Sequence, residues 1–146
     1  MTVSIGSDHG GYQLKEKLIK ALQEQGYEII DQGCQSLESV DYPFYARRVA
    51  RDIQTAVSEK GILICTTGIG MSIVANKFRG IRAALVTNED VAALSRQHND
   101  SNIICLGAKY TPFTEAIKYI LIFLEAEFLG ERHSRRVDMI EEAKEK

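Results

Sequence analysis

The chain has 146 residues, of which 45% are hydrophobic and 26% charged, as expected of one globular domain spanning residues 1–146. Its net charge of -2 gives no bulk attraction for nucleic acid or an anionic membrane, and no apolar run approaches the roughly 20 residues that span a bilayer. The N-terminal segment lacks the features of a signal peptide, and the three cysteines are an odd number without close pairing. We therefore expect a cytoplasmic protein without a disulfide framework, a metal site or a cofactor.

Strand-like and helix-like segments alternate along the chain. Short apolar runs predict strands at residues 3–5, 27–30, 62–65, 83–86 and 103–106. Helical spacing of apolar residues predicts a helix after each strand: Gly26 ends the first, Pro43 opens the second and Asn88 caps the fourth. A long helix begins at Pro112, and a charged helical tail begins at Ser134. This order predicts a doubly wound, five-stranded parallel sheet in a three-layer α/β/α arrangement with a C-terminal helical tail.

Sheets of this kind carry their functional site at the carboxyl ends of the strands. Polar residues that break the strand periodicity fall in those places, at residues 7–11, 65–70, 88 and 107–109. These segments are therefore the first candidates for a binding or catalytic site.

Cys65 ends the third predicted strand and is followed by the turn TTGIG at residues 66–70. Glycines allow tight backbone geometry, and the exposed N–H groups of such a turn can bind an anion. A thiolate at Cys65 would be stabilised beside these donors. The alternative is that Cys65 is a small core residue and the turn only a connection. The turn matches neither the phosphate loop of nucleotide triphosphatases nor, with Met71 in place of the required arginine, the loop of cysteine phosphatases.

Two pairs of polar residues allow both functional and structural interpretations. Asp8 and His9 follow the first strand, where they can hold a sugar hydroxyl or a phosphate, or simply form a turn. His98 can act as a general acid or base near neutral pH, or can cap the C-terminus of its helix. Asn99 can be a left-handed helix terminator.

The basic residues and the other cysteines are weaker signals. Arg132 and Arg136 are four residues apart and share one face of a helix, which suits a phosphate clamp or a solvated charged face. Cys105 is expected to face the core from the fifth strand. Cys34 lies in a polar loop, where we expect a structural residue that is open to oxidation.

Taken in order, several segments of the chain resemble the type B ribose-5-phosphate isomerase family and its relatives, the galactose-6-phosphate isomerase subunits. They are SDHGG (7–11), SVDYP (39–43), GILICTTGIGMSIVANK (61–77), GIRAA (80–84), SRQHNDSN (95–102) and Arg132-His133. The resemblance covers nearly the whole chain. It implies a Rossmann-like fold and a metal-free aldose–ketose isomerase that interconverts D-ribose 5-phosphate and D-ribulose 5-phosphate in the non-oxidative branch of the pentose phosphate pathway. It also implies a homodimer or homotetramer whose sites lie between subunits, so that the tail arginines serve a neighbouring chain.

The resemblance also implies roles for individual residues. Cys65 would be the base that moves a proton between C1 and C2 through an enediolate, Thr67 would orient it, and His98 would open the sugar ring. Backbone N–H groups from residues 66–70 would form the anion hole, with Asn99 assisting. The implied substrate-binding residues are Asp8, His9, Tyr42, Thr66, Gly68, Ile69, Gly70, Asn99, Lys109, Arg132 and Arg136.

One residue departs from the family pattern, which usually has glycine directly after the cysteine where this chain has Thr66. A β-branched residue limits backbone freedom at the turn and adds a hydroxyl near the substrate, so the preferred sugar stays open. The alternatives are a hexose-6-phosphate isomerase acting on galactose or allose 6-phosphate, and a non-catalytic phosphosugar-binding module.

Overall fold

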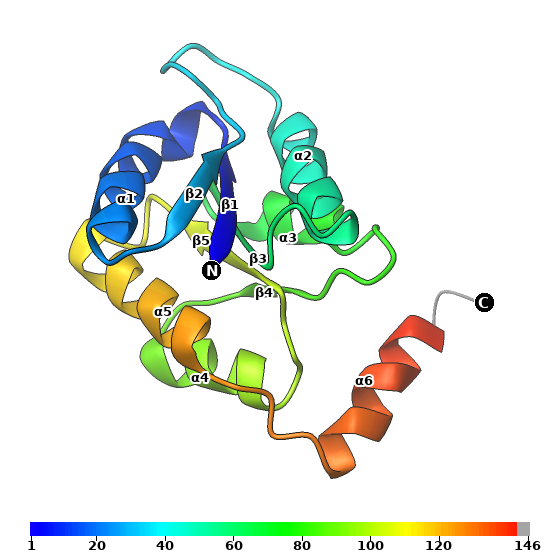
Figure 1. Cartoon of the computed structure of the whole chain (residues 1–146). Coiled ribbons are helices and arrows are strands. Elements are labelled where there is room, and N and C mark those ends of the chain that lie inside the picture. Colours follow the sequence, from blue (N-terminus) through cyan, green and yellow to red (C-terminus); the bar gives the residue numbers. More distant parts are fainter. Residues whose placement is uncertain (143–146) are drawn as a thin grey trace.

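The computed structural model describes residues 1–142 and contains a five-stranded parallel sheet (Figure 1). The strands are β1 (Thr2–Ser7), β2 (Glu28–Asp31), β3 (Lys60–Cys65), β4 (Ala83–Leu85) and β5 (Ile103–Gly107). They lie side by side in the order β2-β1-β3-β5-β4. The predicted sheet is therefore confirmed, with each strand within about two residues of its expected position.

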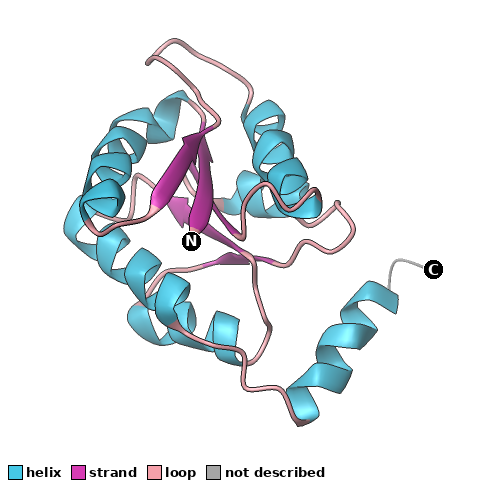
Figure 2. Ribbon diagram, in the orientation of Figure 1, coloured by secondary structure: helices cyan, strands magenta, loops and turns pink. Residues whose placement is uncertain are grey.

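Helices cover both faces of the sheet (Figures 1 and 2). They are η1 (His9–Gly11), α1 (Tyr12–Glu24), α2 (Tyr42–Gln54), α3 (Ile69–Ala75), α4 (Glu89–Gln97), α5 (Phe113–Glu125) and α6 (Arg132–Glu142). Buried residues of α1, α4 and α5 form one hydrophobic core with the sheet, and those of α2 and α3 form a second core on the opposite face. This confirms the three-layer α/β/α arrangement.

The central strand β3 shows why the sequence reads as a continuous apolar run there. Ile62 and Ile64 enter the core beneath α1 and α5, whereas Leu63 and Cys65 enter the core beneath α2 and α3. A parallel strand covered on both faces has no solvent side, so the four positions from Ile62 to Cys65 are all apolar.

Local signals set the helix boundaries. The Asn88 side chain accepts a hydrogen bond from the Val91 N–H at 2.9 Å, as the predicted cap of α4 requires. Pro43 lies in the first turn of α2, and Gly26 follows α1 with a φ of 93°.

The C-terminal helix α6 projects from the rest of the fold (Figure 1). It begins at Arg132, two residues before the expected start of the helical tail. The segment that leads to it is held by a hydrogen bond from the Leu129 N–H to the Gln97 carbonyl at 3.1 Å. No helix within residues 1–142 is long and apolar enough to cross a membrane.

Candidate active site

A cavity of about 450 Å³ opens where β1 and β3 end. Its lining consists of Asp8, Tyr42, Cys65, Thr66, Thr67, Ile69, Gly70 and Ile73. All but Ile73 are residues that the sequence places in the site. Ile73 follows Ile69 by one helical turn, so both present their side chains on the same face of α3. This spacing is the signal in the sequence that could have identified it.

Cys65 is the thiol of this cavity. Its side chain is only 5% exposed, and its Sγ accepts a hydrogen bond from the Gly68 N–H at 3.2 Å. Cys105 lies on the same face of the sheet and is fully buried. Burial, with a smaller contribution from Cys65, raises the pKa of the Cys105 thiol, so this cysteine stays protonated and structural as expected.

The turn after Cys65 has a backbone that leaves N–H groups free. Gly68 has a φ of 79°, and a side chain there would lie 2.8 Å from the Leu106 backbone, so glycine is required. The Thr67 hydroxyl accepts a hydrogen bond from the Ile69 N–H at 3.2 Å. Within residues 1–142, the N–H groups of Thr66, Thr67 and Gly70 have no acceptor. They can therefore stabilise a negatively charged oxygen in the cavity.

Tyr42 and Asp8 form two walls of the cavity. The Tyr42 ring lies against Gly70, because a Cβ at Gly70 would stand 2.5 Å from the ring. Asp8 is 7% exposed, and its carboxylate accepts a hydrogen bond from the Gly10 N–H at 3.0 Å, which fixes it at the start of η1.

Two predicted residues lie at this edge of the sheet outside the cavity lining. The Nδ1 of His9 accepts a hydrogen bond from the Val40 N–H at 3.1 Å, which holds the loop between β2 and α2. Lys109 is exposed, and its Nζ stands 5.7 Å from the centre of the Tyr110 ring. Its N–H donates to the Thr66 carbonyl at 3.1 Å, so its backbone supports the turn.

His98 lies at the opposite edge of the sheet from Cys65. The register pairs Gly61 with Ile103 and Cys65 with Gly107, so β5 begins at the amino end of β3. His98 ends α4 and precedes β5 by five residues. The length of β3 from Gly61 to Cys65, about 13 Å, separates the two edges. One chain therefore does not bring His98 to its own Cys65.

A second group of predicted residues gathers around His98. The His98 and His133 rings stack with centroids 4.3 Å apart. Burial first, then His98 and the flanking Arg132 and Arg136, lower the pKa of His133. Both arginines are exposed on α6 and form no hydrogen bond or ion pair with residues 1–142, and Asn99 is exposed beside His98. This edge therefore carries an imidazole and two guanidinium groups that form no hydrogen bond or ion pair with residues 1–142.

Cys34 is buried, as expected of a structural residue, but its accessibility differs from the expectation. Its side chain is 2% exposed, and its Sγ donates to the Ser36 carbonyl at 3.4 Å. It also lies 3.9 Å from the Ser7 hydroxyl. The loop folds over this thiol, so the interpretation of Cys34 as open to oxidation was wrong.

No group of three His, Cys, Asp or Glu side chains within residues 1–142 is placed to hold a metal ion.

The sequence profile of the Ribose/Galactose Isomerase family matches residues 3–140. The chain belongs to this family. Escherichia coli ribose-5-phosphate isomerase B is 43% identical over 138 residues, which cover 94% of this chain and 93% of that protein. Among solved structures, ribose-5-phosphate isomerase B from Clostridium thermocellum is 46% identical and superposes with a TM-score of 0.98, covering 99% of this chain and 98% of that one.

A further family member carries a ligand. Ribose-5-phosphate isomerase B from Mycoplasma genitalium was solved with bound ribulose 5-phosphate, and it is 38% identical with a TM-score of 0.93 over 99% of this chain and 97% of that one. These relatives establish that the present chain is an isomerase.

Proposed function

We propose that the chain interconverts D-ribose 5-phosphate and D-ribulose 5-phosphate through an enediolate, with Cys65 as the base. This is a reaction of the non-oxidative branch of the pentose phosphate pathway. The observation that carries the proposal is the nearly buried thiol beside free N–H groups in one cavity. Family relatives named for this reaction, one of them with bound ribulose 5-phosphate, support the choice of a five-carbon sugar.

The chemistry needs a base and a site for negative charge. The Cys65 thiolate removes the proton on C2 of the open-chain aldose, and the electron pair forms the enediolate. The thiol then returns the proton to C1, while the hydroxyl proton on O2 passes to O1. Preorganised N–H donors at Thr66, Thr67 and Gly70 stabilise the charged oxygen, which is worth on the order of several kcal/mol.

We infer that a second copy of the chain completes each site. The cavity contains Cys65, whereas the other edge carries the half-buried His98 and the exposed Asn99, Arg132 and Arg136. A twofold dimer can bring these groups of one copy to the cavity of the other, and does so twice. His98 of the partner subunit would then open the furanose ring, and the partner's Arg132 and Arg136 would bind the phosphate.

The rim of the cavity supports a partner at this place. Ile69 and Ile73 of α3 are 51% and 57% exposed, and Leu85 at the end of β4 is 37% exposed. A contiguous exposed apolar surface beside a site is typical of a protein interface. A subunit seated there would also exclude water from the enediolate.

The experiment is isomerisation of ribose 5-phosphate by the purified protein with EDTA present. We expect turnover in the wild type, and loss of turnover with retained sugar-phosphate binding in Cys65→Ala. Cys34→Ala is the matched control, because it removes a buried thiol outside the cavity, and it should keep activity. Full activity in Cys65→Ala would contradict the assignment of the base.

Allose 6-phosphate and galactose 6-phosphate are assayed in parallel. Turnover of a hexose phosphate without turnover of ribose 5-phosphate would make the chain a hexose-6-phosphate isomerase. Binding of all three sugars without any turnover would instead indicate a phosphosugar-binding module.

A further inference from the structure

Asp100 has an unusual backbone for a residue with a side chain. It follows His98 and Asn99 directly and has a φ of 48°, in the left-handed region. Asp and Asn tolerate this region better than most residues. The backbone thus turns sharply at the end of α4, immediately after the proposed acid–base residue.

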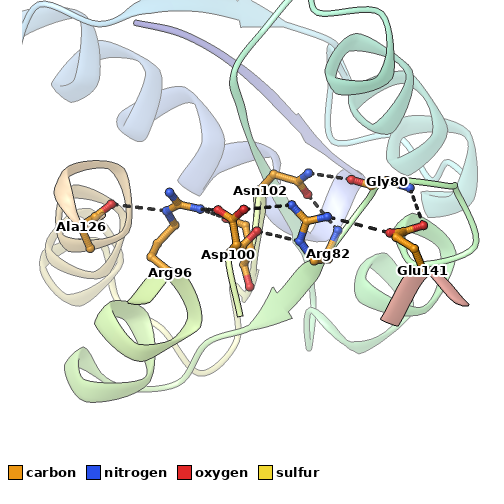
Figure 3. A network of polar contacts seen from close by, with 8 residues as sticks. Gly80, Arg82, Arg96, Asp100, Asn102, Ala126 and Glu141 are labelled. Carbon is orange, nitrogen blue, oxygen red and sulfur yellow. Dashed lines mark hydrogen bonds and ion pairs between the residues drawn. The ribbon is translucent and has the colours of Figure 1, made fainter. Parts of the chain in front are cut away.

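The Asp100 carboxylate lies between two guanidinium groups (Figure 3). Its Oδ1 accepts from Nη1 of Arg96 at 2.7 Å, and its Oδ2 stands 3.4 Å from Nη2 of Arg82. The Asp100 carbonyl also accepts from Nε of Arg82 at 2.8 Å. Asp100, the last residue of the loop that carries His98 and Asn99, is therefore held by one arginine on each side.

Arg96 connects Asp100 to buried parts of the fold. Its side chain is only 9% exposed, and its Nη1 also donates to the Ser101 carbonyl at 2.7 Å. Its Nε reaches the Ala126 carbonyl at 3.4 Å, at the end of α5. The Arg96 side chain therefore links the last turn of α4 to residues 100 and 101, and so bridges the two ends of the segment that contains His98 and Asn99.

Arg82 connects the same carboxylate to α6. Its Nη1 is 3.9 Å from Oε1 of Glu141, and Oε2 of Glu141 accepts from the Gly80 N–H at 3.2 Å. Asn102 fixes this strand start, because its side chain accepts from the Arg82 N–H at 2.9 Å and donates to the Gly80 carbonyl at 2.8 Å. Figure 3 shows the resulting chain of contacts from Ala126 to Glu141.

We propose that Asp100 is a positioning residue for isomerisation: its carboxylate, held by Arg96 and Arg82, fixes the loop that delivers His98 and Asn99 to the cavity of the second copy. This inference rests on the proposed function. Nothing in the cavity of the same chain touches Asp100 among the described residues. Its effect is therefore exerted on the partner's site.

Two substitutions separate the carboxylate from the backbone turn. Asp100→Gly keeps the left-handed turn and removes the carboxylate, so kcat should fall about 10- to 100-fold while KM changes less than about threefold. Asp100→Asn keeps the turn, the shape and one acceptor oxygen, and should lose less. Asp90→Asn, at an exposed position in the first turn of α4, is the matched control and should leave kcat unchanged.

Mixed oligomers distinguish positioning from a general loss of stability. Co-expression of Asp100→Gly with Cys65→Ala creates sites with an intact Cys65 from one chain and an intact loop from the other, so activity should rise well above both parents. Co-expression of Asp100→Gly with His98→Gln creates no such site, and activity should stay low. A merely destabilised chain would behave alike with both partners.

The reference pair Cys65→Ala with His98→Gln tests the proposed function separately. Suppose that this reference pair recovers activity. A wild-type kcat in Asp100→Gly, or equal activity of Asp100→Gly with Cys65→Ala and with His98→Gln, would then overturn the role of Asp100 and leave the proposed function standing. If the reference pair does not recover, the shared site and this inference both fail. If Asp100→Gly does not fold, Asp100→Asn passes through the same pairings with the same criteria.

Discussion

The imidazole rings of His98 and His133 stack almost in parallel, with 11° between their planes and 4.3 Å between their centroids. His133 is 7% exposed and sits between two arginines on α6. The stack therefore attaches the helix that carries the proposed phosphate clamp to the end of α4. A positive charge on His133 weakens this attachment, because it would be buried and would face Arg132 and Arg136.

The protein should lose thermal stability as the pH falls below neutrality, in part through His133. Its pKa is lowered in the folded state, so the unfolded chain binds the proton first as the pH falls below about 6.5. Stability from the neutral ring is full above that pH and declines until the folded-state pKa is passed. Melting temperatures of the wild type and His133→Phe, taken from about pH 7.5 to about pH 5, should show a smaller decline in the variant. An equal decline in both would contradict this role of His133.

The contact between Tyr42 and Gly70 should control substrate binding. In Gly70→Ala, the new Cβ would lie 2.5 Å from the Tyr42 ring, so the ring has to move from the cavity wall. Overpacking of this kind costs about 1–3 kcal/mol. We expect KM for ribose 5-phosphate to rise about tenfold, a change of about 1.4 kcal/mol. Ile73→Val, which trims a different wall residue without a clash, serves as control, and an unchanged KM in Gly70→Ala would refute the prediction.

Lys15 should contribute to stability through a buried ion pair. Its side chain is fully buried, with Nζ 2.9 Å from Asp31 and 2.8 Å from Glu16. Burial lowers the pKa of Lys15, but the hydrogen bonds to these carboxylates outweigh it, so the pKa is raised.

Asp31→Ala should therefore destabilise the protein. Asp31 is partly exposed and Glu16 remains, so the loss is expected at about 1–3 kcal/mol rather than the full value for a broken buried pair. Denaturant titration compares it with Glu24→Ala, which removes an exposed carboxylate at the last residue of α1 and should change stability by less than about 0.5 kcal/mol. A loss in Asp31→Ala as small as that of the control would contradict the pairing.

The sequence predicts the fold well because its signals are local. Apolar runs such as residues 62–65, a cap at Asn88 and a proline in the first turn of α2 each act over a few residues. Helix ends are less predictable: Val57 continues the apolar pattern of α2, yet α2 ends at Gln54 and Val57 is 52% exposed. Ala56, with a φ of 60°, turns the chain away before Val57 can pack.

Contacts between distant segments could not be predicted from one sequence. The burial of Cys34 depends on a loop that folds against Ser7, and the pairing of Arg82 with Asp100 depends on the order β3-β5-β4. Arg96 and Asp100 are also a case of this kind, because α4 ends at Gln97 and the two side chains meet only where the chain turns back at Asp100.

The position of His98 relative to Cys65 does follow from the topology. A crossover helix returns the chain to the amino edge of a parallel sheet, so a residue at the end of α4 cannot lie at the carboxyl edge. The sequence identifies both residues as candidates for one site, and the structure places them at opposite edges of the sheet.

Mixing two inactive chains is the most direct test of whether each site takes Cys65 from one copy and His98 from another. Cys65→Ala and His98→Gln are co-expressed with different tags, and ribose 5-phosphate isomerisation is measured for the mixture, for each parent and for a control mixture of Cys65→Ala with Cys65→Ser. If each site joins Cys65 of one chain to His98 of another, random pairing gives half mixed dimers with one intact site of two, so about a quarter of wild-type activity should return. Activity no higher than that of the parents and the control mixture would contradict a site shared between two copies.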